Sequence, residues 1–463
     1  MKKINQKTGQ IGLALKVVKI GEAWKDYTQG KELLAEKDLS ERLGENDSLL
    51  DLILSEENIE EAMNRVIRNK GSAGIDGMET KDLLKYMKKN WQTIKEKILE
   101  GKYKPQAVKE VEIPKANGKT RKLGIPTVID RTIQQAINQI LQEIWEPNFS
   151  DNSYGFRPKK SAHQALTKLK ENISEGNTWC VDVDLKNFFN EVNHDKLMYR
   201  MFEKIKDKRV LKLIRKYLRT GILNNGLVSN PEKGTPQGSP LSPLLSNIVL
   251  NDLDQELENR GHKFVRYADD FIILVKSSRA GERVKSSIKK YIEEELKLLV
   301  NEEKSQIVEC NQLNYLGYGI LNNKEHPRLK VSEGSQKKLK SKVKILTRKT
   351  IGKSVSEVIK ELNIYLKGWI GYFGYADTEY ALEKLNGWIR RRLRALIWKQ
   401  WKNGYNRCRK LQILGLGKTE ALKTAGSKNR DVRYKSTTFG MHKALSIKYF
   451  EKLGLIKLTP RTC

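Results

Sequence analysis

The alternation of apolar and polar positions predicts several short β-strands in the first two thirds of the chain. Residues Val108–Pro114 alternate, and after an Asn-Gly turn signal at 117–118 the chain returns through Thr120–Ile125, as in a hairpin. Trp179–Leu185 is predicted as a strand, and Phe264–Val275 as a strand, a turn and a second strand. The sequence therefore indicates short antiparallel strands.

Apolar residues at helical spacing predict long helices between these strands. The clearest is Val128–Trp145, where Ile133, Ile137, Ile140, Leu141 and Ile144 form one stripe. Ser55 is a candidate N-cap for a helix that runs to Lys70. Further elements are expected at Asp195–Thr220, Ser239–Leu257 and Ser286–Leu299 (helices) and at Gln312–Leu321 (a short hairpin). This mixture is typical of an α+β fold.

The composition excludes several classes of protein. The 463 residues, 38% of them hydrophobic, are enough for roughly three domains with real cores, so a wholly disordered chain is excluded. The four cysteines are far apart and include no C-x-x-C pair, which excludes a disulfide scaffold and a cysteine-rich zinc module and fits a reducing cytosol. No apolar run approaches the ~18 residues of a membrane span. We expect a soluble, cytoplasmic protein with no membrane partner.

Charge changes this picture most. The chain carries 88 Lys and Arg against 56 Asp and Glu, a net charge of +32, which attracts polyanions. From residue 330 onward there are 32 basic and 9 acidic residues, so a net +23 and four of the eight tryptophans lie in the last 134 positions. This distribution predicts a nearly neutral body followed by a strongly basic module that binds nucleic acid.

Carboxylates in the apolar strands suggest a metal site. In Trp179–Leu185 the residues Asp182 and Asp184 share one strand face, and Asp269-Asp270 stand at the predicted turn of Phe264–Val275. A solvated sheet edge would explain the first pair alone. Together the acidic residues match the platform that hard Mg²⁺ prefers, on which two ions assist phosphoryl transfer.

At Tyr267–Asp270 the sequence YADD resembles the Y-A-D-D box of reverse transcriptases, and other blocks resemble those of group II intron reverse transcriptases in the same order. They are Ile113–Gln135, Tyr154–Ala165, Val183–Asn193, Gly234–Asp254, Leu298–Ser305 and Asn314–Gly319. The resemblance spans roughly Leu49 to Leu458. It implies a right-hand polymerase fold, in which fingers and an antiparallel palm sheet precede an α-helical basic thumb.

The resemblance also implies residue roles. Asp184, Asp269 and Asp270 would be catalytic and hold two Mg²⁺ ions; Asp184 is chosen over Asp182 because it directly precedes the L-K-x-F-F segment. For nucleotide binding, Lys115 and Arg121 match the fingers residues that clasp the triphosphate, Phe188 matches the gate that excludes a 2′-hydroxyl, and Gln237 would line the pocket. Core packing for Phe188 and a plain turn for Gln237 are the alternatives.

The basic segment Leu366–Lys402 resembles the thumb, or maturase domain, of the same family. Its amphipathic helix offers Arg390, Arg391, Arg392 and Arg394 to RNA phosphates, although a solvated helix face is the simpler reading. The predicted domains are 1–48 (N-terminal extension), 49–329 (fingers and palm), 330–420 (thumb/maturase) and 421–463 (short basic nucleic-acid-binding tail). The tail resembles that of the bacterial class without an endonuclease domain.

These observations predict an RNA-directed DNA polymerase that also assists splicing and retrohoming of a group II intron. Its expected partners are an RNA template, a DNA or RNA primer, dNTPs, group II intron RNA and target DNA. Two alternatives stay open: a free-standing relative used in DNA repair or defence, and an RNA-binding splicing cofactor that no longer polymerises. The intact acidic residues disfavour the second.

Overall fold

The computed structural model describes residues 48–114, 120–224, 227–229, 231–321, 326–348, 352–426 and 431–460. The described residues divide into two compact units: the residues up to Asn172 together with Trp179–Ile307, and Ile173–Thr178 together with the residues from Val308 onward. The first unit ends at Ile307, before the domain boundary that the sequence predicts after residue 329. The predicted boundary concerns functional domains and stays a proposal.

The first unit combines helices with two four-stranded sheets. Its helices are α2 Leu49–Ile53, α3 Glu56–Asn69, α4 Leu83–Leu99, α5 Val128–Trp145, α6 Ala162–Ser174, α7 Phe188–Glu191, α8 His194–Lys204, α9 Lys208–Leu218, α10 Ser242–Asn259 and α11 Ser278–Glu294. One sheet has the order β2-β1-β4-β5, from β1 Val108–Pro114, β2 Thr120–Ile125, β4 Ile222–Asn224 and β5 Leu227–Ser229. The predicted β1–β2 hairpin is confirmed as an antiparallel pair.

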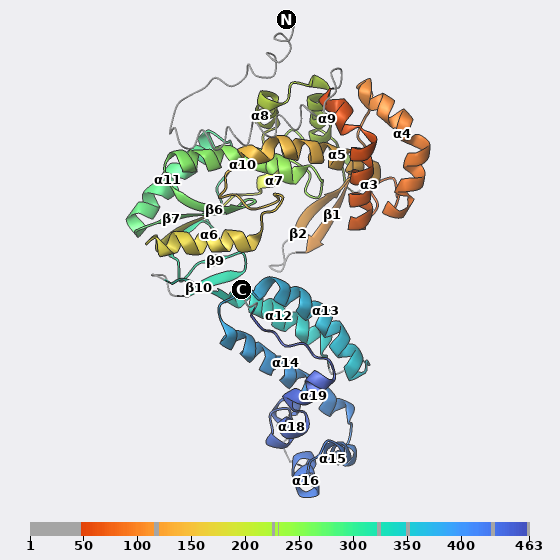
Figure 1. Ribbon diagram of the computed structural model, residues 1–463, viewed down its shortest axis with the longest axis vertical. Helices are drawn as coiled ribbons and strands as arrows, with labels where there is room; N and C mark the ends of the chain where they lie inside the picture. The colour runs from red at the N-terminus through yellow and green to blue at the C-terminus, as the bar shows by residue number, and fades with distance from the viewer. Residues whose placement is uncertain are drawn as a thin grey trace, which may run out of the picture. The chain divides into compact units, whose positions relative to one another are not determined.

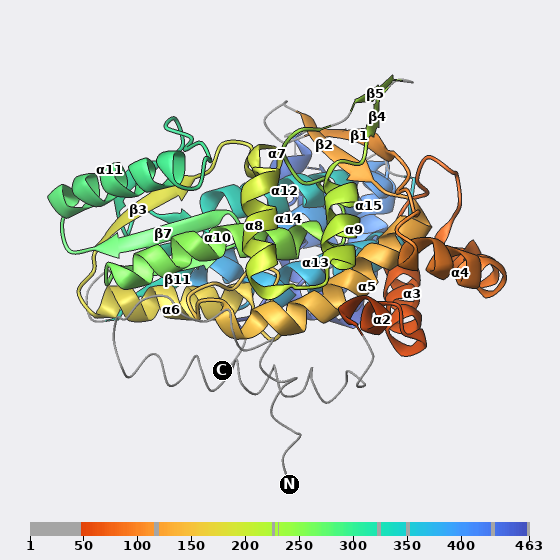
Figure 2. The same ribbon diagram turned by 90° about the horizontal axis from the view of Figure 1, so that it is seen from above.

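The second sheet is the one that matters for function. Its order is β6-β7-β3-β8, from β3 Trp179–Asp184, β6 Lys263–Tyr267, β7 Asp270–Val275 and β8 Gln306–Glu309. Figure 1 shows α10 and α11 on one side of this sheet and α6 on the other. In Figure 2, β3 and β7 run side by side with α11 next to β3, against which it packs. The alternation predicted for Trp179–Leu185 explains why helices pack on this face of β3, because Val181 and Val183 point into the core.

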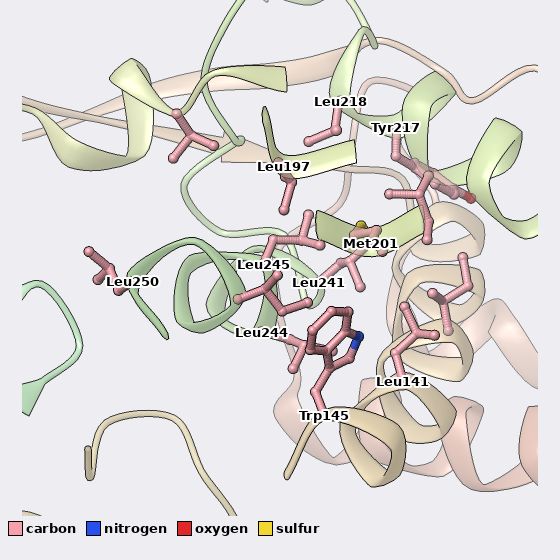
Figure 3. Close-up of a cluster of buried hydrophobic side chains, with 14 of the residues drawn as sticks. Leu141, Trp145, Leu197, Met201, Tyr217, Leu218, Leu241, Leu244, Leu245 and Leu250 are labelled. Carbon is pink, nitrogen blue, oxygen red and sulfur yellow. The ribbon is translucent and has the colours of Figure 1, made fainter. Parts of the chain in front are cut away.

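One hydrophobic core joins the helices of the first unit. Figure 3 shows Leu141 and Trp145 of α5 facing Met201 of α8 and the leucines at the start of α10. The predicted stripe of α5 is confirmed, since Ile133, Ile137 and Ile140 are all buried. The core therefore fixes α10 against the sheet.

The second unit is mainly helical. Its helices are α12 Glu333–Leu346, α13 Val355–Phe373, α14 Glu379–Gln400, α15 Gly404–Ile413, α16 Lys418–Gly426, α17 Val432–Lys435, α18 Phe439–Ala444 and α19 Ile447–Lys452, and its sheet has the order β11-β10-β9. The strands are β9 Asn314–Tyr315, β10 Tyr318–Leu321 and β11 Arg328–Val331, so the short hairpin expected at Gln312–Leu321 is confirmed. Asn386 of α14 bonds the backbone of Leu458 in both directions, at 2.9 Å each, and so holds the end of the chain.

The α+β class is confirmed, but some element boundaries were wrong. The helix expected from Ser286 begins at Ser278, where the Ser277 side chain caps it by accepting from Ala280 N. Charged residues interrupt the apolar periodicity of that first turn, which is why the pattern started too late. No helix among the described residues is long and apolar enough to cross a membrane.

Candidate active site

The three predicted catalytic carboxylates lie at the paired ends of neighbouring strands. In the antiparallel β3–β7 ladder, Asp184 stands directly opposite Asp270. Asp269 precedes β7 in the tight turn from β6, where Tyr267 pairs with Asp270. Residues directly opposite in such a ladder have Cβ atoms about 5 Å apart. Strand pairing thus gathers residues 86 positions apart in the chain.

The turn that carries Asp269 is held in a strained conformation. Ala268 has a φ of 59°, in the left-handed region that costs a non-glycine residue about 1–2 kcal/mol. Arg266 donates from Nη1 to the Ala268 carbonyl at 2.9 Å. Gly155 approaches so closely that a Cβ there would lie 2.2 Å from Ala268 N. The turn is therefore fixed from both sides.

Arg266 is itself anchored by a fully buried ion pair. Its Nε and Nη2 reach the two carboxylate oxygens of Asp254 in α10 at 2.7 and 2.5 Å, and both side chains are 0% exposed. Asn247, which precedes Asp254 in the same helix α10, accepts from Arg266 Nη1 at 3.0 Å and donates to the Gly155 carbonyl at 2.9 Å. Helix α10 thus positions the catalytic turn through one hydrogen-bond network.

Asp184 is held by residues that follow α11. Lys304 Nζ lies 3.0 and 3.2 Å from its two carboxylate oxygens, and Asn301 Nδ2 donates to Oδ1 at 3.1 Å. The Asp184 backbone N–H also donates to Ser305 Oγ at 3.1 Å. The block Leu298–Ser305 resembles a palm block in sequence, but sequence reasoning gave these side chains no role.

The acidic residues perturb one another. Asp270 keeps an exposed surface, but the groups around its carboxyl raise the pKa to about 7, first by loss of surrounding water and then by the negative charges of Asp182, Asp269 and Asp184. Asp182 lies on the Asp184 side of the strand, and its carboxylate accepts from Gln306 Nε2 at 3.2 Å. Burial also raises the pKa of Asp182. A cation would relieve this crowding.

The acidic residues at the ends of β3 and β7 offer the type of ligand that a hard divalent ion requires. Among the described residues, no three His, Cys, Asp or Glu side chains are grouped closely enough to form a ready metal site. The Lys304 ammonium lies against Asp184 as the local positive charge. Carboxylate oxygens from two strands are nevertheless the ligands that Mg²⁺ prefers, so the residues suit the ion by chemistry.

An open cavity of about 410 Å³ contains two of the predicted nucleotide-binding residues. Arg121 of β2 donates from Nε to Gln237 Oε1 at 2.8 Å. The next residue, Gly238, has a φ of +111°, and a Cβ there would lie 2.6 Å from the Gly124 carbonyl oxygen. Only glycine therefore lets the backbone beside Gln237 approach β2 this closely. The proposed partner Lys115 lies outside the described residues.

The predicted gate lies deeper than expected. Phe188 is 2% exposed and belongs to the hydrophobic core, so the packing alternative describes its present environment. Its neighbour Phe189 lines the cavity, with ring centroids 5.4 Å apart in an edge-to-face pair. Sequence reasoning missed Phe189, and the doubled Phe in the segment was the signal that could have found it.

Two of the four arginines predicted to bind RNA make hydrogen bonds inside the second unit, and the RNA-binding role of all four stays a prediction. Arg394 is 4% exposed and donates from Nε to the Leu445 carbonyl at 2.9 Å. Arg392 donates to the carbonyl and hydroxyl oxygens of Thr347, both at 3.0 Å. Arg391 is exposed and Arg390 half-buried. Spacing alone could not separate these roles, because α14 is covered on more than one side.

Paired strands with acidic ends, α10 and α11 on one face of the sheet, and an adjoining basic cavity define a polymerase of the right-hand type. The family profile described as reverse transcriptase (RNA-dependent DNA polymerase) matches residues 113–320, and the group II intron maturase-specific domain matches residues 336–413. The chain belongs to the group II intron reverse transcriptases with a maturase domain, and its function is that of an RNA-directed DNA polymerase and maturase.

Several known proteins are similar to this chain over part of its length. Protein YkfC of Escherichia coli (strain K12) is 33% identical over 59% of this chain and 82% of the relative. The group II intron-encoded protein LtrA of Lactococcus lactis subsp. cremoris is 32% identical over 58% of each chain. A chain of a solved partial Cas6-RT-Cas1–Cas2 complex is 25% identical over 53% of this chain and 43% of its own, with a TM-score of 0.35. This chain thus spans only part of LtrA.

Proposed function

We propose that this chain extends a DNA or RNA primer along an RNA template by adding dNTPs, with the reaction centred on Asp184, Asp269 and Asp270. The observation that carries the proposal is the pairing of Asp184 with Asp270 across β3 and β7, beside the turn that presents Asp269. Its setting is the cytoplasm, because four widely spaced cysteines suit a reducing compartment.

These three carboxylates would hold two Mg²⁺ ions. Bound there, the ions would neutralise charge on the attacking and leaving oxygens and lower the pKa of the primer hydroxyl. The chain supplies the anionic platform, and the network of Arg266 and Asp254 keeps its turn from moving. Lys304 balances the charge of Asp184 through its ion pair.

The cavity residues would bind the incoming nucleotide. Arg121 and Gln237 are hydrogen-bonded to each other at its wall, so one cation and one amide would face the same nucleotide. Lys115 is proposed as the second cation of the triphosphate clasp. The edge-to-face pair of Phe188 and Phe189 would limit the space at the sugar and so favour dNTPs.

The second unit would bind group II intron RNA during splicing, and RNA and target DNA during retrohoming. Its net positive charge and the exposed Arg391 support backbone contacts to phosphates. Structured RNA is recognised largely by shape and backbone, which suits a basic helical surface.

Primer extension on an RNA template tests the proposal. The wild-type chain should incorporate dNTPs only when Mg²⁺ is supplied, and Asp269→Ala/Asp270→Ala should abolish incorporation while RNA binding persists. Extension by the double variant at a rate near that of wild type would contradict the assignment of the site.

A further inference from the structure

The ring of Phe156 is presented to the cavity in a way that packing does not explain. Its side chain is 49% exposed although Phe is normally buried, and it lines the cavity together with Arg121 and Gln237. Its backbone has a φ of 60°, in the left-handed region that disfavours a residue with a Cβ. Backbone strain that is not compensated by burial of the side chain is typical of functional sites.

Both neighbours of Phe156 are immobilised. Gly155 packs against the backbone of Ala268 in the catalytic turn, and its carbonyl accepts from Asn247 at 2.9 Å. Arg157 is buried: it pairs with Glu146 at 2.8 Å and donates to the Ser153 carbonyl, also at 2.8 Å. The backbone that carries the ring is therefore held between two fixed residues, one of which packs on the catalytic turn.

The cavity around the ring has the chemistry of a nucleotide site. Its described lining includes two cations, Arg121 and Arg131, two exposed or half-exposed rings, Phe156 and Phe189, and no acidic residue. Cations suit phosphates, and an aromatic face suits a nucleobase of any sequence. The second ring has its edge-to-face partner in Phe188, whereas no ring pair is present for Phe156 among the described aromatic contacts.

We propose that Phe156 stacks on a nucleobase of the nascent base pair and so contributes to nucleotide binding. This inference rests on the proposed polymerase function. Because every base has a π-face, stacking there stabilises correct and incorrect sequences alike, and the ring contributes affinity rather than sequence choice.

Three variants separate stacking from packing. Phe156→Asn removes the ring but tolerates the left-handed backbone, Phe156→Leu keeps apolar bulk without an aromatic face, and Phe156→Tyr keeps the face. The measurements are the melting temperature, and the KM for dNTP and kcat in primer extension on RNA.

The expected result is a KM for dNTP raised about tenfold in Phe156→Asn and Phe156→Leu, with kcat less affected, since lost ground-state binding raises KM. Phe156→Tyr should match wild type. The melting temperature of Phe156→Asn should equal or exceed that of wild type. A template with an abasic site identifies the source: the penalty disappears there if the ring stacks on the template base and persists if it stacks on the incoming base.

Two results would overturn the inference. One is a KM within twofold of wild type in both Phe156→Asn and Phe156→Leu. The other is loss of folding in both, which would assign the ring to packing. A wild-type chain that extends no primer would instead contradict the proposed function itself, so the two failures are distinguishable.

Discussion

At the scale of single residues, the catalytic turn depends on a buried charge rather than on surface acids. Arg266 lies between Val265 and Tyr267 in β6 and is 0% exposed, yet its guanidinium makes four hydrogen bonds, to Asp254, Asn247 and the Ala268 carbonyl. An arginine in the middle of an apolar strand was a visible signal of such a partner, because buried charges are almost always paired.

Breaking this pair should separate stability from activity. Arg266→Met alone leaves Asp254 buried and uncompensated, so we expect about 3–5 kcal/mol less stability in denaturant unfolding. Arg266→Met/Asp254→Leu should recover most of that loss, since both charges are gone. Primer extension should stay low in the double variant, because the Ala268 carbonyl still lacks its donor. Full recovery of extension would show that the network serves stability only.

Sugar selection is the second prediction at this scale. Phe188→Ala should raise the use of rNTPs relative to dNTPs about tenfold or more, and it should also cost about 3–5 kcal/mol because the ring lies in the core. Phe189→Ala is the matched control from the same pair. Competition between rNTPs and dNTPs in single-nucleotide addition measures sugar selection in the two variants. A larger effect of Phe189→Ala would show that Phe189, and not Phe188, is the gate.

At the scale of elements, the periodicity of apolar residues predicted where helices and strands lie. It did not predict which side chains of a helix are buried by other helices. The ranges expected for β1, β2 and α5 match the structure, because alternation and the apolar stripe are local signals. Burial of α14 was not local: Arg392 and Arg394 bond to Thr347 and Leu445, which lie more than forty positions away. The sequence showed a basic helix but not which of its guanidinium groups other helices cover.

The arginines of α14 should therefore differ in their effects. Arg394→Gln removes a buried, charged donor from the Leu445 carbonyl and should lower stability by about 1.5–3 kcal/mol in thermal or denaturant unfolding. Arg391→Gln should leave stability unchanged and weaken RNA binding, with a salt slope lower by about 0.7–0.9. Equal loss of RNA affinity in both variants at full folding would contradict this division.

At the scale of the whole molecule, charge and chemistry lie in different units. The acidic residues and the cavity belong to the first unit, and most of the excess positive charge lies in the chain beyond residue 330. Composition predicted this split, because charge is a sum over residues. That Asp184 and Asp270 share one site was predicted from the resemblance to reverse transcriptases. The structure explains it by the pairing of β3 with β7, a long-range contact that no local pattern encodes.

This division predicts different salt responses. Binding of long, structured RNA should weaken steeply with salt, because phosphate neutralisation releases counterions. Addition of one dNTP to a preformed primer–template at saturating concentration should change little over the same range. Titrations of both from low to moderate salt would check this, and parallel slopes would place the RNA contacts in the catalytic unit.

The most direct test of the central claim compares two neighbouring carboxylates of one strand. Asp184 pairs with Asp270, whereas Asp182 pairs with Ile272 and bonds Gln306. In primer extension on RNA, Asp184→Asn should lower the rate at least about a hundredfold, because a metal ligand contributes several kcal/mol to the transition state. Asp182→Asn should lower it less than about tenfold. The reverse order, or equal rates in the two variants, would contradict a catalytic centre at the paired ends of β3 and β7.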